Sequence, residues 1–117
     1  MKTVADILRT KINHQIHTIW PTATVLEALN LMADKGIGAL VVVEGDNVVG
    51  IVSERDYARK IALMERSSYT TEVSEIMTSN VITVTPAQKI RYCMELMTEK
   101  HLRHLPVLND GKLTGLI

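Results

Sequence analysis

The segment Gly50-Ile51-Val52-Ser53-Glu54-Arg55-Asp56 changes character within seven residues, from an apolar run to a hydroxyl and then to charged side chains. The apolar residues that precede Ser53 predict a strand, and the run from Asp56 to about Glu65 predicts a helix. Ser53 and Asp56 therefore fall where a strand ends and a helix begins, a junction at which α/β proteins often bind ligands. A carboxylate held there can accept hydrogen bonds from both hydroxyls of a ribose.

The same pattern has a purely structural interpretation. Ser53-x-x-Asp56 is also typical of a capping box, in which the two side chains satisfy backbone N–H groups at the helix start. The residues of this segment alone favour capping. If Asp56 serves only its own helix end, the ribose role is lost.

Composition bounds the class of protein. The chain has 117 residues, is 46% hydrophobic, and balances 13 basic against 13 acidic side chains. This predicts one modest globular domain with no broad positive field, which argues against nucleic-acid and membrane binding. No apolar stretch is long enough for a membrane span or a signal peptide, so we expect a cytoplasmic protein. The single cysteine, Cys93, is expected to be buried and reduced.

The sequence is a tandem repeat of two related segments. A shift of 65 residues aligns Gly50 with Gly115, together with a series of prolines, apolar residues and lysines (Pro21/Pro86, Val25/Ile90, Leu29/Met94, Met32/Met97, Lys35/Lys100, Leu40/Leu105 and Val42/Val107). A shift of 69 aligns residues 4–8 with 73–77. We therefore expect two copies, 1–72 and 73–117, whose sheets pack against each other about a pseudo-twofold axis.

Each copy predicts the same order of elements in a mixed α/β fold. In the first copy these are a helix over 3–9, a strand over 16–20, a helix from Thr24 to Gly36, a hairpin of strands 39–43 and 48–52, and a closing helix over 56–65. The second copy predicts a helix over 73–77, strands over 81–84, 105–108 and 113–117, and a helix with four inward residues, Ile90, Cys93, Met94 and Met97. The chain stops before a second closing helix, and we expect the natural chain to run on past Ile117.

These features resemble one family, the CBS domain pair, also called the Bateman module. The resemblance depends on the tandem β-α-β-β-α copy, on Gly50-Ile51-Val52-Ser53-x-x-Asp56, and on Leu102-Arg103-His104-Leu105-Pro106-Val107. The segments Glu54-Arg55-Asp56-Tyr57 and Ile82-Thr83-Val84-Thr85-Pro86 are most similar to the stand-alone pairs of bacteria and plant organelles, which carry no enzyme domain.

The resemblance implies a regulatory sensor that binds an adenine nucleotide in the cleft between the copies. AMP is the first expected ligand; ADP, ATP, NAD and S-adenosylmethionine are further ones, and no metal is required. By position, Asp56 would hold the ribose, Ser53 a hydroxyl or phosphate, and Arg103 and His104 the phosphates. The other implied contacts are Ile51, Val81 and Ile82 around adenine, Pro106 at the turn, and Arg55.

The two copies differ where the phosphate contacts are expected. At the shift of 65, Arg103 falls on Gly38 and His104 on Ala39, so the first copy offers no charge there. The residues that would match Ser53 and Asp56 in the second copy lie past Ile117. We therefore expect one nucleotide per chain.

Three alternatives compete with this interpretation. Catalysis is disfavoured because Ser53 lacks a Gly-x-Ser-x-Gly elbow and a partner histidine, and no paired carboxylates flank a cleft. A metal site is disfavoured because the four histidines are scattered in sequence (His14, His17, His101 and His104). The third alternative is a ligand-free structural module that forms a homodimer and regulates an unidentified partner protein.

Overall fold

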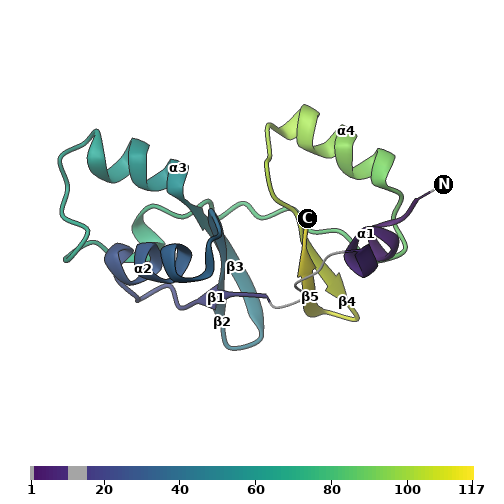
Figure 1. The fold of residues 1–117 in the computed structure, drawn as a ribbon, viewed down its shortest axis with the longest axis horizontal. Helices are drawn as coiled ribbons and strands as arrows, with labels where there is room; N and C mark the ends of the chain where they lie inside the picture. Colours follow the sequence, from purple (N-terminus) through teal and green to yellow (C-terminus); the bar gives the residue numbers. More distant parts are fainter. Residues whose placement is uncertain (1, 11–15) are drawn as a thin grey trace. The chain divides into compact units, whose positions relative to one another are not determined.

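The computed structural model describes residues 2–10 and 16–117 (Figure 1). Within them, residues 17–81 form one compact unit, and residues 2–10 and 16 form a second unit with residues 82–117. The bounds of the two sequence copies, 1–72 and 73–117, therefore differ from the bounds of the compact units. Each unit is described below by itself.

The unit of residues 17–81 is built on a three-stranded sheet in the order β1-β2-β3. Strand β1 (Thr18–Ile19) pairs in parallel with β2 (Ala39–Glu44), which pairs antiparallel with β3 (Asn47–Ser53). Gly45 turns the hairpin with a φ of 62°, a conformation that glycine adopts without steric cost. Both predicted hairpin strands are confirmed.

Two helical segments accompany this sheet. Helix α2 (Val25–Lys35) begins where the Thr24 side chain accepts a hydrogen bond from the N–H of Glu27, and it ends at Gly36 in the left-handed conformation. Helix α3 (Glu54–Tyr57) continues into a π-helical turn, η1 (Ala58–Ala62). The predicted closing helix is thus present, but it starts at Glu54 rather than at Asp56, because Ser53 is its N-cap.

The core of this unit lies between the helices and one face of the sheet. Leu40, Val42 and Val52 are fully buried there with Val25, Ala28 and Met32 of α2. Side chains alternate between the two faces of a strand, so Ile51 and Ser53 lie on the face opposite Val52. Strand β3 thereby carries its core residue and its candidate site residues on different faces.

The second unit combines a hairpin with two helices. Its elements are α1 (Val4–Thr10), α4 (Ile90–Lys100), β4 (Pro106–Asn109) and β5 (Lys112–Leu116), and the two strands are antiparallel. The helix and hairpin predictions for this part of the chain are confirmed. The core contains five buried residues, Val4, Val84, Cys93, Leu105 and Val107.

The opening segment of each copy packs on the sheet of the other copy. In residues 17–81, the second copy opens with the 3-10 turn η2 (Val73–Glu75). Its Val73 N–H donates a hydrogen bond to Ala23 O of the first copy at 2.8 Å. In the other unit, Val4 N–H donates to Gln88 O at 2.8 Å. This exchange explains why the unit boundaries cut across the sequence repeat.

Each opening segment packs closely against a glycine of a strand, and these two glycines align in the repeat. A Cβ on Gly50 would meet Met77 Sδ at 2.4 Å, and a Cβ on Gly115 would meet Leu8 Cδ2 at 2.7 Å. Leu8 and Met77 align at the shift of 69, so the two contacts repeat one packing arrangement. The opening segment lies directly against the strand at both positions, with a backbone carbonyl (Thr78 O) within reach at Gly50 and only the Leu8 side chain at Gly115.

Two expectations for the second copy are wrong. The predicted strand over 81–84 is reduced to a single bridge between Val84 and Val107; directly after it, Thr85 N–H donates to the Gln88 side chain and the chain leaves the sheet. Met94 does not face inward but is 62% exposed. The inward stripe of α4 instead comprises Cys93 with the partly buried Ile90, Leu96 and Met97.

Candidate functional site

The junction of β3 and α3 holds a complete capping box. The Ser53 side chain accepts a hydrogen bond from Asp56 N–H at 3.2 Å. In return, Asp56 Oδ2 accepts hydrogen bonds from Ser53 N–H at 2.9 Å and from the Ser53 hydroxyl at 3.0 Å. The capping interpretation of this motif is therefore confirmed.

The second carboxylate oxygen of Asp56 takes no part in the cap. Its neighbour is the ammonium group of Lys60, at 3.4 Å. The Asp56 side chain is 15% exposed and the Lys60 side chain 45% exposed. Lys60 also donates a hydrogen bond to the carbonyl of Ile76 at 2.7 Å, so it links the closing helix to the segment that follows η2.

The other predicted contacts in residues 17–81 surround this junction. Ile51 lies two residues before Ser53 on the same face of β3, is partly buried, and exchanges two backbone hydrogen bonds with Thr78. Arg55 is exposed in the first turn of α3, and Val81 is partly buried at the end of the unit. The structure brings Ile51, Ser53 and Asp56 to one strand end.

The remaining predicted residues belong to the other unit. Arg103 is exposed and His104 half-buried in the segment between α4 and β4. Pro106 is buried at the start of β4, where its carbonyl accepts a hydrogen bond from Val84 N–H at 3.0 Å, and Ile82 packs against the core of that unit. The site residues thus form two sets, one in each unit.

Two titratable groups outside these sets have shifted pKa values. Hydrogen bonds from the Thr3 backbone and hydroxyl lower the pKa of the Asp6 carboxyl at the start of α1. Burial raises the pKa of the Cys93 thiol, which is 2% exposed, as expected for a core cysteine.

No cluster of three metal-ligating side chains occurs within residues 2–10 and 16–117. His14 lies outside the described residues. Across the same ranges, the structure has no helix with the length and apolar character needed to cross a membrane.

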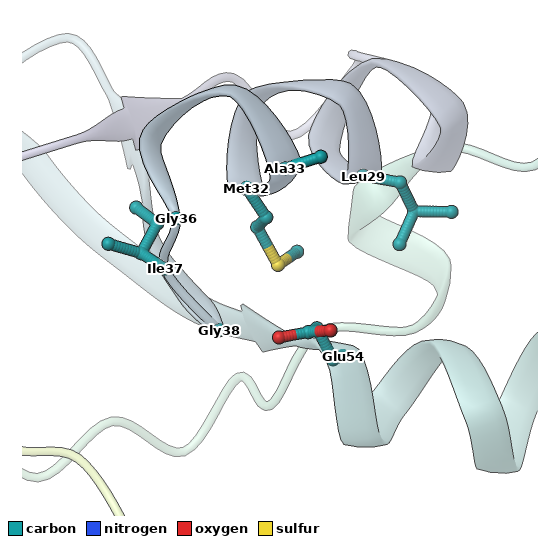
Figure 2. A pocket seen from close by; sticks show the side chains of 7 residues that line it. All are labelled: Leu29, Met32, Ala33, Gly36, Ile37, Gly38 and Glu54. Atoms are coloured by element: carbon teal, nitrogen blue, oxygen red, sulfur yellow. The ribbon is translucent and has the colours of Figure 1, made fainter.

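The sequence prediction missed two residues of this region. Lys60 stands four residues after Asp56, a spacing at which opposite charges meet on a helix, and that spacing could have identified it. The sequence assigns Glu54 no role, yet its side chain lines a pocket beside α2 (Figure 2). Glu54 reaches this pocket because Glu54 N–H donates to Gly38 O at 3.0 Å, directly beyond the pair of Ala39 and Ser53 in the hairpin.

Comparison with known proteins identifies the family. The CBS domain model matches residues 4–63 and 73–117. The chain belongs to the CBS domain family. The two matches make it a CBS pair, which confirms the predicted tandem repeat, and a CBS pair is a regulatory module.

Relatives of this CBS pair include stand-alone proteins. It is 40% identical over 123 residues to the mitochondrial CBS domain-containing protein CBSX3 of Arabidopsis thaliana, covering 98% of this chain and 60% of the plant protein. A solved protein with CBS domains from Burkholderia ambifaria has 56% identity and a TM-score of 0.94, with 99% of this chain and 87% of that chain covered. The chain therefore spans less than two thirds of its plant relative.

A more distant structure shares the fold. The CBS domain pair of protein MJ0100, solved in complex with 5-methylthioadenosine and S-adenosyl-L-methionine, has a TM-score of 0.83 and 24% identity, covering 99% of this chain and 88% of that one. At this identity the likeness concerns the fold alone.

Proposed function

We propose that this CBS pair is a non-enzymatic sensor that binds one adenosine-containing ligand per chain, with Asp56 recognising the ribose. The observation that supports the proposal is that the two oxygens of the Asp56 carboxylate have different partners. Oδ2 completes the cap, whereas Oδ1 makes no cap bond. A capping role and a ligand role can therefore coexist in one side chain.

The present partner of Oδ1 can be replaced. The contact with Lys60 is 3.4 Å long, and nearly half of the lysine side chain is exposed. Ion pairs with such exposure contribute only about 0–1 kcal/mol. A ribose hydroxyl can donate a charge-assisted hydrogen bond to the carboxylate at a shorter distance than 3.4 Å, so it can take the place of Lys60 at Oδ1.

The other assignments follow the resemblance. Ile51, Val81 and Ile82 are proposed around the adenine, and Arg103 and His104 at the phosphates, with Arg55 and Pro106 as neighbouring contacts. AMP is the first ligand to test, followed by ADP, ATP, NAD and S-adenosylmethionine. The regulated partner protein is unidentified, and a ligand can act on it only through different affinities for two arrangements of the module.

The test compares wild type with Asp56→Asn. The amide oxygen of the introduced asparagine can still accept the hydrogen bonds of the cap, whereas its NH₂ group cannot accept from a ribose hydroxyl. At a hundred times its Kd, a ligand stabilises the folded state by about 2.7 kcal/mol, which raises the melting temperature by several degrees. We expect one of these five ligands to raise the melting temperature of wild type but not that of Asp56→Asn.

A stoichiometry measurement completes the test. Isothermal titration should give one site per chain, because the first copy has Gly38 and Ala39 where the second has Arg103 and His104. Two equal sites would contradict the proposed asymmetry. A shift retained in full by Asp56→Asn would contradict the ribose role.

The second candidate is a ligand-free module that acts as a homodimer. The complete capping box favours it, since Ser53 and Asp56 then have a sufficient structural reason to be present. Leu63 and Met64, which are 77% and 66% exposed beyond η1, offer apolar surface for a second copy. Sedimentation of wild type and of Leu63→Ser/Met64→Ser tests this candidate: a dimer that the double variant dissociates, with no nucleotide shift, would favour it.

A further inference from the structure

A pocket of about 470 Å³ lies within residues 17–81, beside the C-terminal half of α2 (Figure 2). That half of the helix forms one wall and the turn that follows it a second, while Glu54 at the start of α3 closes the third side. Its lining residues are Leu29, Met32, Ala33, Gly36, Ile37, Gly38 and Glu54. This volume is within the usual range for small-molecule sites, about 300–1,000 Å³.

The walls of this pocket are mostly apolar. Figure 2 shows the Met32 side chain directed into the hollow, with Leu29 and Ile37 on either side. Met32 is only 3% exposed, so its position is fixed by the core beneath it. A ligand here gains binding energy from a hydrocarbon group that covers the partly buried Leu29 and Ile37.

Glu54 supplies the one charge among the lining residues. Within the part of the chain that the structure describes, no ion pair engages its carboxylate, which Figure 2 shows below Met32. The nearby basic residue at the end of α2, Lys35, lies 3.8 Å from Asp34 in an exposed pair. The carboxylate is therefore available to a ligand.

The end of α2 adds to the negative potential. Gly36 N–H and Ile37 N–H bond to the carbonyls of Ala33 and Met32, at 3.4 and 3.0 Å, so the helix stops directly at the pocket. The C-terminal end of a helix carries a partial negative charge, which favours cations within the last turn. Both Glu54 and the helix end thus select for a positively charged group.

Gly38 allows the carboxylate to occupy this position. Glu54 N–H donates to Gly38 O at 3.0 Å, and a Cβ on Gly38 would come within 3.0 Å of Glu54 Oε1. A larger residue at position 38 would make the carboxylate give way by a few tenths of an ångström. The glycine and the glutamate therefore form a matched pair at the floor of the pocket.

We propose that this pocket binds a small organic cation, an ammonium group that carries an aliphatic or aromatic hydrocarbon. The ammonium would pair with Glu54 at the end of α2, and the hydrocarbon would lie against Leu29, Met32 and Ile37. The site uses none of the residues assigned to the adenosine ligand, so it does not depend on the proposed function.

The test uses hexylammonium and phenethylammonium with their neutral counterparts, hexanol and phenylethanol. Binding is followed by NMR chemical-shift changes of the Met32 methyl group in wild type, Glu54→Gln and Gly38→Ala. We expect the amines to shift this methyl, the alcohols to bind more weakly, and both variants to lose about three- to tenfold in affinity. Glu44→Gln, an exposed change on β2 outside the pocket, is the matched control and should leave affinity unchanged.

Three results would overturn the proposal. These are the absence of a shift at Met32, equal binding of amine and alcohol, and unchanged affinity in Glu54→Gln. Because the cap of α3 is formed by Ser53 and Asp56 and not by the Glu54 side chain, Glu54→Gln should keep the native spectrum elsewhere. Loss of nucleotide binding in Asp56→Asn has no bearing on this outcome, so the two proposals can fail separately.

Discussion

The ammonium nitrogen of Lys60 lies 3.4 Å from Oδ1 of Asp56, four residues earlier on the same helical segment. The same nitrogen donates to Ile76 O at 2.7 Å. Lys60 therefore holds the one oxygen that the cap leaves available, and a ribose at Asp56 would have to displace it. This competition gives Lys60 a predictable effect on both binding and stability.

Replacing Lys60 with methionine should strengthen ligand binding while weakening the fold. Removal of the competing ammonium should raise the affinity for the adenosine ligand roughly two- to fivefold. Loss of the bond to Ile76 O should lower the free energy of unfolding by about 0.5–1 kcal/mol, at the low end because Lys60 is half exposed. Isothermal titration and urea unfolding measure the two effects. Arg59→Met, an exposed neighbouring change, is the control, and weaker binding in Lys60→Met would contradict the competition.

The capping box should contribute measurably to stability. Ser53→Ala removes the acceptor of Asp56 N–H and one donor to Asp56 Oδ2, and the loss of an N-cap side chain costs about 1 kcal/mol. The melting temperature should fall by a few degrees, whereas Ser53→Thr should retain most of the stability. Thr24→Ala at the start of α2 is the matched control and should show a similar loss. An unchanged melting temperature in Ser53→Ala would show that the cap adds nothing to the stability of the fold.

Local sequence signals predicted most of the first copy correctly. The caps at Thr24 and Ser53, the glycine at Gly36 and the Gly45-Asp46 turn each have a physical cause within a few residues. Such signals work because backbone hydrogen bonds and positive φ angles are satisfied locally.

Features set by distant parts of the chain were not predictable in this way. The single bridge at Val84 depends on Val107, which lies 23 residues later, although the bond from Thr85 N–H to Gln88 that follows it is local. The approach of Glu54 to Gly38 follows from the predicted hairpin, since Ala39 pairs with Ser53, but the position of the Glu54 side chain beside α2 does not. Alignment with Leu29 predicts an inward Met94, but α4 is buried along Cys93 and Leu96 instead. Ile90, Cys93 and Met97 face the core as the aligned Val25, Ala28 and Met32 do, so among the four predicted inward residues of α4 Met94 is the exception.

The paired glycines should respond unequally to alanine. At Gly50 the new methyl group would meet Met77 Sδ at 2.4 Å and the Thr78 carbonyl at 3.0 Å, whereas at Gly115 the atoms within reach belong to the Leu8 side chain. Backbone cannot move aside as a leucine side chain can, so Gly50→Ala should lose more stability. Overpacking costs about 1–3 kcal/mol, and we expect Gly50→Ala near the upper end and Gly115→Ala near the lower end. Urea unfolding of both variants provides the comparison, and a larger loss in Gly115→Ala would contradict it.

Burial of Cys93 should make stability depend on pH in the alkaline range. Burial raises the pKa of its thiol, because the thiolate loses hydration in the core. An unfolded chain releases the thiol proton near pH 8.5, while the folded chain still holds it, so unfolding releases a proton above about pH 8.5. The stability that the protonated Cys93 thiol gives the folded state is therefore fully present below about pH 8.5. It declines as the pH rises from there toward the raised pKa of the folded chain.

Cys93→Ala tests this dependence. The variant should be less stable at neutral pH because of the cavity it creates, but its stability should decline less steeply between about pH 8 and pH 10. Urea unfolding across this range gives both slopes, and native Cys93 should react with iodoacetamide far more slowly than the unfolded chain, because the thiol is 2% exposed. Parallel pH profiles for wild type and Cys93→Ala, or native alkylation at the unfolded rate, would show that the thiol titrates freely in the fold.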